Sequence, residues 1–175
     1  WSSDVCSSDL TITAAKADYE YGSTGANSFS KTSLKTGDDI SSVTYRYYES
    51  DGTTLLGTAP TAVGSYVIKA SVPVFSTGSA DNYTFTYNQG TFQVTIKAIT
   101  IAVDSQTITY NDSPASNSYA NPSLVPGDVI GSVSYTYYDS TNTTSLGATQ
   151  PTAVGTYKIR ATGATFTSGS DSNYN

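Results

Sequence analysis

One phrase occurs twice in this chain. Residues 60–70 read PTAVGSYVIKA and residues 151–161 read PTAVGTYKIRA, a displacement of 91 positions. Three further pairs of segments keep a displacement of 90 or 91: residues 32–40 with 122–130, 43–50 with 133–140, and 75–83 with 166–174. A nearly fixed displacement over most of the chain indicates a duplicated domain and not a short motif. We therefore expect two tandem repeat modules, residues 11–98 and residues 99–175.

The first ten residues are set apart from this repeat. Residues 1–10 read WSSDVCSSDL, which resembles the translation of a DNA adapter used in preparing short-read sequencing libraries. We therefore exclude them from fold reasoning, as one would an expression tag. They hold the single Trp and the single Cys of the chain, Trp1 and Cys6. Without Asp4 and Asp9, the balance of 8 basic and 14 acidic residues becomes 8 and 12, a net charge of −4.

The second module is expected to be truncated before its final hairpin. Asn175 aligns with Thr84, after which the first module continues TFTYNQGTFQVTIK to Lys97. The second module then has no counterparts of Phe92, Val94 and Ile96. We expect its core to be uncovered and less ordered for that reason.

Composition indicates an all-β, mostly antiparallel fold. The chain has 15 Tyr residues and only 13% charged residues, and β-branched and aromatic residues dominate its apolar set. Good helix formers are sparse or scattered. The net negative charge argues against a nucleic-acid partner, which requires a basic face. No apolar run approaches the length of a membrane span.

Period-two alternation locates the strands and their buried faces. In residues 65–72 we expect four residues to point inward and three outward: Tyr66, Ile68, Ala70 and Val72 inside, Val67, Lys69 and Ser71 outside. The second module keeps the same alternation of inward and outward residues, with Tyr157, Ile159 and Ala161 inside. Residues 83–96 read as a hairpin around Asn88-Gln-Gly90, with Phe92, Val94 and Ile96 on its apolar face. The segment from Gly22 to Ser42 is less regular, and there we expect Phe29 and Leu34 to anchor the chain to the core.

The residue types exclude most catalytic chemistry. With no His and no Cys beyond Cys6, the Ser-His-Asp triad, Cys nucleophiles and His- or Cys-ligated zinc are unsupported. A carboxylate pair for glycoside hydrolysis remains formally open, but the acidic residues stand mostly in turns, where Asp is favoured for local hydrogen bonding. Glu49-Ser-Asp51-Gly52 hints at a calcium loop, but its counterpart Asp139-Ser-Thr141-Asn142 has one carboxylate fewer, and a hairpin turn explains both. We therefore expect no enzyme, no catalytic residue, no cofactor and no metal site.

Lysines on strands raise the question of Lys–Asn or Lys–Asp amide crosslinks, which occur in some surface adhesins. Lys69 is replaced by Arg160, which cannot form such a bond, and Lys16 and Lys97 have no matched partner in a full second module. We interpret these lysines as solvated charges on the outer face of the sheets.

Two adjacent tyrosine pairs are the best candidates for binding. Alternation directs one ring of Tyr47-Tyr48 and one ring of Tyr137-Tyr138 outward. An exposed ring can stack on a sugar or on a partner's side chain, but a cross-strand contact that stabilises the sheet is the favoured interpretation.

Several phrases of the chain stand in a fixed order and spacing: TIT near Tyr21-Gly22, the L-x-x-G-D turn from Leu34 to Asp38, AVGSY or AVGTY, the pair Asn82-Tyr83, and G-T-F-x-V-T-I from Gly90 to Ile96. Together they resemble the MBG-type repeat domains of large bacterial surface and secreted proteins, including filamentous-haemagglutinin-like adhesins. Tyr110-Asn111 departs from Tyr-Gly, so we expect that turn to differ in the second module. The resemblance implies β-rich modules, for which a β-grasp-like arrangement with a reduced helix is one candidate.

The resemblance also implies a function and a location. We expect a non-enzymatic spacer within an extracellular adhesin at the bacterial cell surface, in contact with neighbouring modules of the same chain. The alternative is a module that binds a carbohydrate or a protein, a host or environmental glycan for example, through its outward tyrosines.

Overall fold

The computed structural model describes residues 7–113 and 115–175, which form two compact units divided between Ile96 and Lys97. The division lies two residues before the predicted boundary. Strands dominate both units, their pairing is mostly antiparallel, and no helix of seven or more residues occurs among the described residues. The all-β prediction is confirmed. The helical elements are the short 3₁₀ turns Ala80–Asn82 and Asp171–Asn173.

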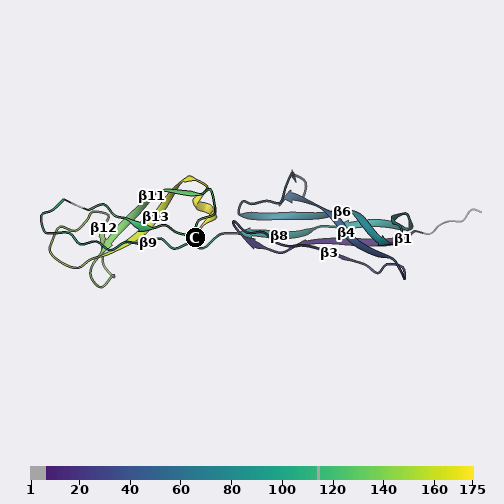
Figure 1. Cartoon of the computed structure of the whole chain (residues 1–175), viewed down its shortest axis with the longest axis horizontal. Coiled ribbons are helices and arrows are strands. Elements are labelled where there is room, and N and C mark those ends of the chain that lie inside the picture. Colours follow the sequence, from purple (N-terminus) through teal and green to yellow (C-terminus); the bar gives the residue numbers. More distant parts are fainter. Residues whose placement is uncertain (1–6, 114) are drawn as a thin grey trace, which may run out of the picture. The chain divides into compact units, whose positions relative to one another are not determined.

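Unit 1 consists of two sheets that share one core (Figure 1). The first sheet has the order β3-β1-β7 and the second the order β2-β8-β6-β4-β5. The strands are β1 (Ser8–Lys16), β2 (Tyr19–Glu20), β3 (Asn27–Lys31), β4 (Asp39–Glu49), β5 (Leu55–Leu56), β6 (Gly64–Thr77), β7 (Tyr83–Asn88) and β8 (Gly90–Thr95). Two pairs are parallel, β1 with β7 and β2 with β8.

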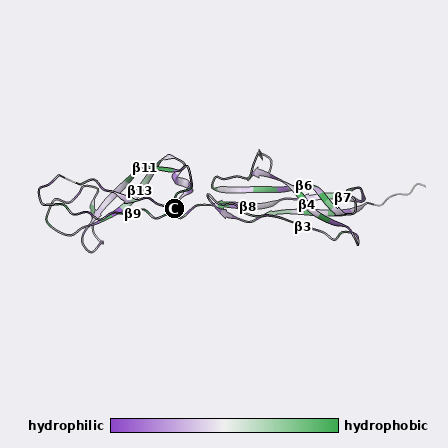
Figure 2. Ribbon diagram, viewed as in Figure 1, coloured by the Kyte–Doolittle hydropathy of each residue, from purple (hydrophilic) through white to green (hydrophobic). Residues whose placement is uncertain are grey.

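The alternation of the sequence builds the core of unit 1. Leu10, Ile12 and Ala14 of β1 are at most 1% exposed, because every second side chain of a strand points to the same face. On β6, Tyr66, Ile68 and Ala70 are 7%, 0% and 4% exposed, as predicted. Figure 2 shows hydrophobic stretches on β6 and on other strands of this unit. Phe29 and Leu34 pack against the same core, which confirms their predicted role as anchors.

The start of β1 corrects the treatment of the first ten residues. Residues 1–6, which include Trp1 and Cys6, lie outside the described residues. Ser8 to Leu10, however, belong to β1, and Leu10 is one of the most completely buried side chains. The last residues of the excluded segment therefore take part in the fold.

The predicted hairpin of residues 83–96 is wrong. β7 pairs with β1 in the first sheet, whereas β8 pairs with β6 and β2 in the second sheet. Gly90 allows β8 to pass close to β1, because a Cβ at this position would lie 2.2 Å from the carbonyl oxygen of Ala14. Phe92 and Val94 are buried as predicted, but Ile96 is 44% exposed.

Two residues of β6 also depart from the predicted alternation. Val72, expected inside, is 66% exposed with φ 43°, because the register of β6 against β4 shifts at this point. Such a bulge inserts residues on one strand and reverses which face the following side chains meet. Val67, expected outside, is 3% exposed and lies in register between Tyr48 and Thr91.

Unit 2 repeats part of this plan. Its strands are β9 (Ala102–Val103), β10 (Tyr119–Ala120), β11 (Val129–Tyr138), β12 (Ser145–Gly147) and β13 (Lys158–Ser168). The sheet β12-β11-β13 corresponds to β5-β4-β6 of unit 1, and β9 pairs with β10 as β1 pairs with β3. Lys97 forms a parallel bridge to Tyr174, the counterpart of the β1–β7 pairing. Tyr137 is its one buried hydrophobic residue among those described.

Candidate functional site

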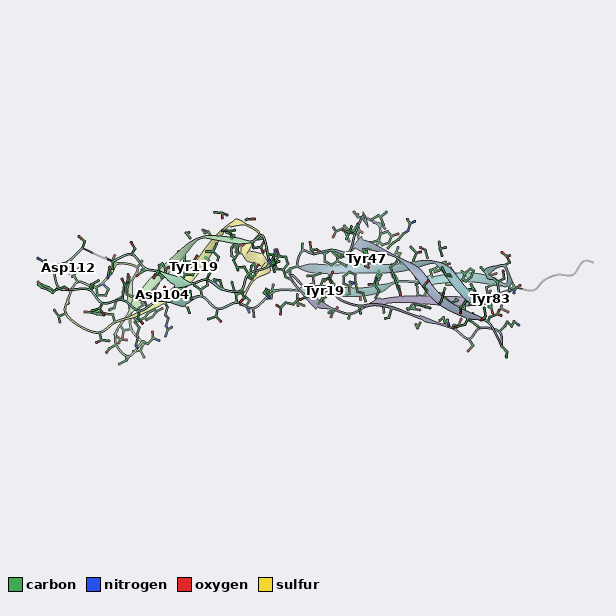
Figure 3. All side chains as sticks on the ribbon, viewed as in Figure 1. Tyr19, Tyr47, Tyr83, Asp104, Asp112 and Tyr119 are labelled. Atoms are coloured by element: carbon green, nitrogen blue, oxygen red, sulfur yellow. The ribbon has the colours of Figure 1, made fainter. Side chains whose placement is uncertain are left out.

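The inner ring of each tyrosine pair belongs to the core. Tyr47 meets the ring of Phe92 edge-on at a centroid distance of 6.2 Å, and its hydroxyl accepts a hydrogen bond from Asn27 Nδ2 at 2.7 Å. Tyr137 is 4% exposed, and Asn117 Nδ2 donates to its hydroxyl at 2.9 Å. In Figure 3, Tyr47 lies near Tyr19 toward one end of unit 1, and Tyr83 lies toward the other end. These inner tyrosines stabilise the fold.

The outer ring of each pair is covered by a cation from the neighbouring strand. Lys69 Nζ lies 4.6 Å from the ring centroid of Tyr48 and donates to the carbonyl oxygen of Gly52 at 2.7 Å. The guanidinium of Arg160 lies 4.5 Å from the ring of Tyr138, and its Nε donates to Asn142 Oδ1 at 2.9 Å. Each cation–π contact stabilises by about 0.5–1 kcal/mol at an exposed site. The Lys-to-Arg exchange therefore preserves a cation that joins a strand, a ring and a turn.

The acidic residues considered for calcium act within their own turns. Asp51 Oδ1 accepts from the backbone N–H groups of Thr53 and Thr54 at 2.7 and 2.9 Å, and Oδ2 accepts from the Thr54 hydroxyl at 2.7 Å. These hydrogen bonds, that of the Thr54 hydroxyl first, hold the pKa of Asp51 well below its ordinary value. The backbone N–H of Thr143 is the main group that lowers the pKa of Asp139 to about 2. Within residues 7–113 and 115–175, no three His, Cys, Asp or Glu side chains gather where they could hold a metal.

Lys16 is not a solvated outer charge. It continues the inward alternation of β1 and is 9% exposed. Its Nζ donates to the carbonyl oxygen of Gly25 and, at 3.1 Å, to Asn27 Oδ1 on β3. The same Nζ lies 5.0, 5.6 and 5.7 Å from the ring centroids of Tyr19, Tyr47 and Phe92. Burial lowers the pKa of Lys16, because desolvation disfavours the charged ammonium.

Hydrogen bonds join the L-x-x-G-D turn to the tyrosine of the Asn-Tyr pair, and we call this set of contacts a tie. The Tyr83 hydroxyl donates to Asp38 Oδ2 at 2.8 Å and accepts from the Lys35 N–H at 3.0 Å. Gly78 completes the tie, since a Cβ there would lie 2.3 Å from Asp38 Cγ. Unit 2 repeats the tie: the Tyr174 hydroxyl donates to Asp128 Oδ2 at 2.6 Å. Sequence reasoning treated these phrases as separate, although their joint recurrence in both modules was a signal that they meet.

The AVGSY and AVGTY phrases each close a loop on themselves. The Tyr66 hydroxyl donates to the Ala62 carbonyl at 2.9 Å and crosses over Gly64, where a Cβ would lie 3.2 Å from that hydroxyl. Tyr157 makes the same bond to Ala153 at 3.1 Å. A larger residue at the glycine would push the ring away from the loop.

The turn that contains Tyr21-Gly22 does not change in the second unit, contrary to expectation. Gly22 has φ 82° and its counterpart Asn111 has φ 72°. The N–H of the next residue donates three positions back in both units, at 2.9 and 3.0 Å. Asn is one of the few non-glycine residues that tolerate this left-handed conformation.

One comparison with known proteins identifies the first unit. A family model described as MBG domain (YGX type) matches residues 10–93. Neither a curated protein nor a solved structure matches the chain. The structure contains no helix, among its described residues, with the length and apolar character needed to cross a membrane. Residues 10–93 cover nearly all of unit 1 and include Tyr21-Gly22, and this unit is therefore a member of the MBG domain family, YGX type.

Proposed function

We propose that the chain is a non-enzymatic spacer, in which each MBG-type module extends a large bacterial adhesin at the cell surface or in secreted form. The MBG domain match suggests a β-rich domain of surface proteins, which supports this proposal. The observation that carries the proposal is that the phrases shared by both units form internal ties. Tyrosine hydroxyls, turn aspartates and strand cations bind other parts of their own unit.

The path of the chain through unit 1 suits a spacer. Ser8 pairs with Tyr83 at one end of the unit. Val94 pairs with Tyr19 toward the other end, and Thr95 follows Val94 there (Figure 3). The chain thus enters and leaves at opposite ends. β6 has 14 residues, which at about 3.3 Å per residue span roughly 45 Å. Tension along the unit loads β1 and β8 along their length, so that several backbone hydrogen bonds must break together.

Single-molecule stretching of the full chain between handles on its two ends tests this proposal. Unfolding of residues 8–96 releases roughly 270 Å, from about 3.5 Å per extended residue less the folded length. We expect unit 1 to give one such step at a force well above that of unit 2. A gradual, low-force extension of unit 1 would contradict a load-bearing spacer.

The alternative, binding through the outward tyrosines, receives less support. Tyr48 and Tyr138 do not form a bare aromatic strip, because Lys69 and Arg160 cover them. A glycan array and a matrix-protein binding assay with wild type, Tyr48→Ala and Tyr138→Ala distinguish the two functions. Saturable binding that is lost in both variants would replace the spacer by a binding module.

A further inference from the structure

Lys16 and Asn27 stand opposite each other on neighbouring strands. They are register partners in the antiparallel pairing of β1 with β3, and side chains of such a pair lie on the same face of the sheet. On β1 this face points into the core, since Lys16 is 9% exposed and continues the inward alternation of the strand. Lys16 Nζ lies 3.1 Å from Asn27 Oδ1. A buried amine therefore lies beside the carbonyl of a carboxamide.

Contacts from other elements hold this amine in place. Lys16 Nζ also donates to the carbonyl oxygen of Gly25. Position 25 requires glycine for this approach, because a Cβ there would lie 2.1 Å from a backbone carbonyl oxygen. The ring centroids of Tyr19, Tyr47 and Phe92 lie 5.0, 5.6 and 5.7 Å from the amine. The fold thus fixes a nucleophile relative to the carboxamide that it would attack.

Burial also favours the form of Lys16 that can react. Desolvation lowers the pKa of Lys16, and a neutral amine is the form that attacks a carbonyl carbon. The titratable groups that face this amine are the phenols of Tyr19 and Tyr47. Burial raises the pKa of Tyr19, so its phenol stays uncharged where the amine becomes neutral.

Unit 2 contains the same carboxamide without the amine. Asn117 Nδ2 donates to the Tyr137 hydroxyl at 2.9 Å, which repeats the Asn–Tyr contact of unit 1. Ser105 stands in place of Lys16, and Gln106 Nε2 donates to the oxygen of the Asn amide instead. A neutral side chain therefore satisfies this oxygen. The fold does not require a buried amine here, although burying one in unit 1 has a desolvation cost.

We propose that Lys16 and Asn27 react to form an intramolecular amide crosslink between β1 and β3. The bond from Lys16 Nζ to Asn27 Cγ forms, the Cγ–Nδ2 bond breaks, and one ammonia molecule leaves. Oδ1 takes a proton from Nζ as the tetrahedral intermediate forms. The Tyr47 hydroxyl, 2.7 Å from Nδ2, gives its proton to the leaving nitrogen and recovers one from Oδ1 as the carbonyl reforms. The fixed geometry supplies the rate, because groups held in this way reach effective concentrations of about 10⁵–10⁸ M.

Mass spectrometry of the full chain tests the proposal. Purification at about pH 6 gives the open form, in which Lys16 keeps its amine and titrates, and incubation at about pH 9 starts the reaction. We expect a time-dependent loss of the mass of one ammonia molecule, and peptide mapping should join the peptides that contain Lys16 and Asn27. Hydroxylamine should not reverse the loss, which distinguishes the crosslink from a succinimide at Asn27. In single-molecule stretching, crosslinked unit 1 should release roughly 30 Å less than the open form, because residues 17–26 stay in a closed loop.

Three variants and two internal controls complete the test. Lys16→Arg, which keeps the cation, and Asn27→Ala should both retain the full mass. Tyr47→Phe keeps the ring and should slow crosslinking at least about tenfold. Unit 2 should yield no linked peptide that contains Asn117. Circular dichroism checks that each variant folds. The wild-type chain in urea at the same pH needs no substitution and should not crosslink, since unfolding separates the pair.

The inference fails if the folded wild-type chain keeps its full mass during prolonged incubation at about pH 9. It fails equally if the lost ammonia maps to another residue, if hydroxylamine reverses the loss, or if the unfolded chain reacts as fast as the folded one. An unchanged rate in Tyr47→Phe would overturn the role given to its hydroxyl. The spacer function does not depend on this bond.

Discussion

Replacement of Phe92 by Ala tests how strongly β8 closes the core of unit 1. Phe92 is 2% exposed and packs on three tyrosine rings, those of Tyr19, Tyr47 and Tyr66. An aromatic side chain that buries about 150 Å² contributes about 4 kcal/mol at about 25 cal/mol per Å². Measured Phe-to-Ala substitutions in cores cost about 3–5 kcal/mol, because the cavity left behind collapses only partly. We expect a loss of about 4 kcal/mol in the unfolding free energy of unit 1.

Urea unfolding followed by far-ultraviolet circular dichroism measures this loss, and hydrogen exchange at Ile12 and Ile68 assigns the transition to unit 1. Gln93→Ala is the matched control, since Gln93 is the next residue of β8 and its side chain is exposed on the opposite face. The control should change stability by less than about 0.5 kcal/mol. A loss below about 1.5 kcal/mol for Phe92→Ala, or equal losses for both variants, would refute the role assigned to this ring.

Three further substitutions probe single features. Gly90→Ala should destabilise unit 1 by about 1–3 kcal/mol in urea unfolding, because the added Cβ meets the Ala14 carbonyl. Gly57→Ala is the control and should be neutral, because Gly57 has open space around it. Equal effects of the two substitutions would contradict the close approach of β8 to β1. The pKa of Asp139 is lowered from 3.8 to about 2, so its contribution to the stability of unit 2 is complete above pH 3.8 and is lost as the pH falls toward 2. Asp139→Asn should therefore reduce the dependence of unit 2 stability on pH in this range. An unchanged dependence in acid unfolding would refute this role of Asp139. Burial lowers the pKa of Lys16 from 10.5, so the unfolded chain holds this proton to higher pH than the folded chain does. Wild-type stability should therefore rise relative to Lys16→Met as the pH is raised toward 10.5. A difference that stays constant in chemical denaturation over this rise in pH would exclude the lowered pKa.

The sequence predicted the inner face of the strands well, because burial on one face imposes a period of two. Tyr66, Ile68 and Ala70 follow it, and so does Lys16, which continues the series Leu10, Ile12 and Ala14. The interpretation of Lys16 as an outer charge was wrong because it rested on the charge of the side chain. The position of Lys16 in the alternation of β1 indicates an inward side chain. Val72 could not be predicted in the same way, since a bulge changes the period at a point that only the partner strand defines.

The hairpin at residues 83–96 failed for a different reason. Asn88-Gln-Gly90 has the composition of a turn, but a local pattern does not say which sheet the following strand joins. Here Gly90 serves a close approach between β8 and β1 rather than a two-strand turn. The sheet order depends on contacts between residues about 75 positions apart, such as Gln93 with Asp18, and alternation carries no information about these.

The candidate site was predicted only in part. Sequence reasoning selected the tyrosine pairs and favoured their structural role, and the cations over Tyr48 and Tyr138 agree with it. It did not foresee that Lys69 and Arg160 perform the same task, because the exchange was considered only for crosslinking. The cation–π contact depends on cross-strand register, which the sequence does not specify.

Comparison of the two units shows which properties the duplication keeps. Four left-handed positions coincide, Gly37 with Gly127 and Gly78 with Gly169, while Gly52 and Gly22 are replaced by Asn142 and Asn111 at nearly the same φ; Val72 and Gly147 are left-handed in one unit alone. Outward side chains differ at most positions, apart from the ring of Tyr48 or Tyr138 and the cation that covers it. The residues at Lys16 and its counterpart Ser105 differ as well, and in unit 2 Gln106 Nε2 instead donates to the Asn117 amide. A binding surface would require the outward side chains to be kept, whereas a spacer requires turns, ties and strand registers. Both units share turns, ties and strand registers. These shared features support a module that transmits load through its backbone.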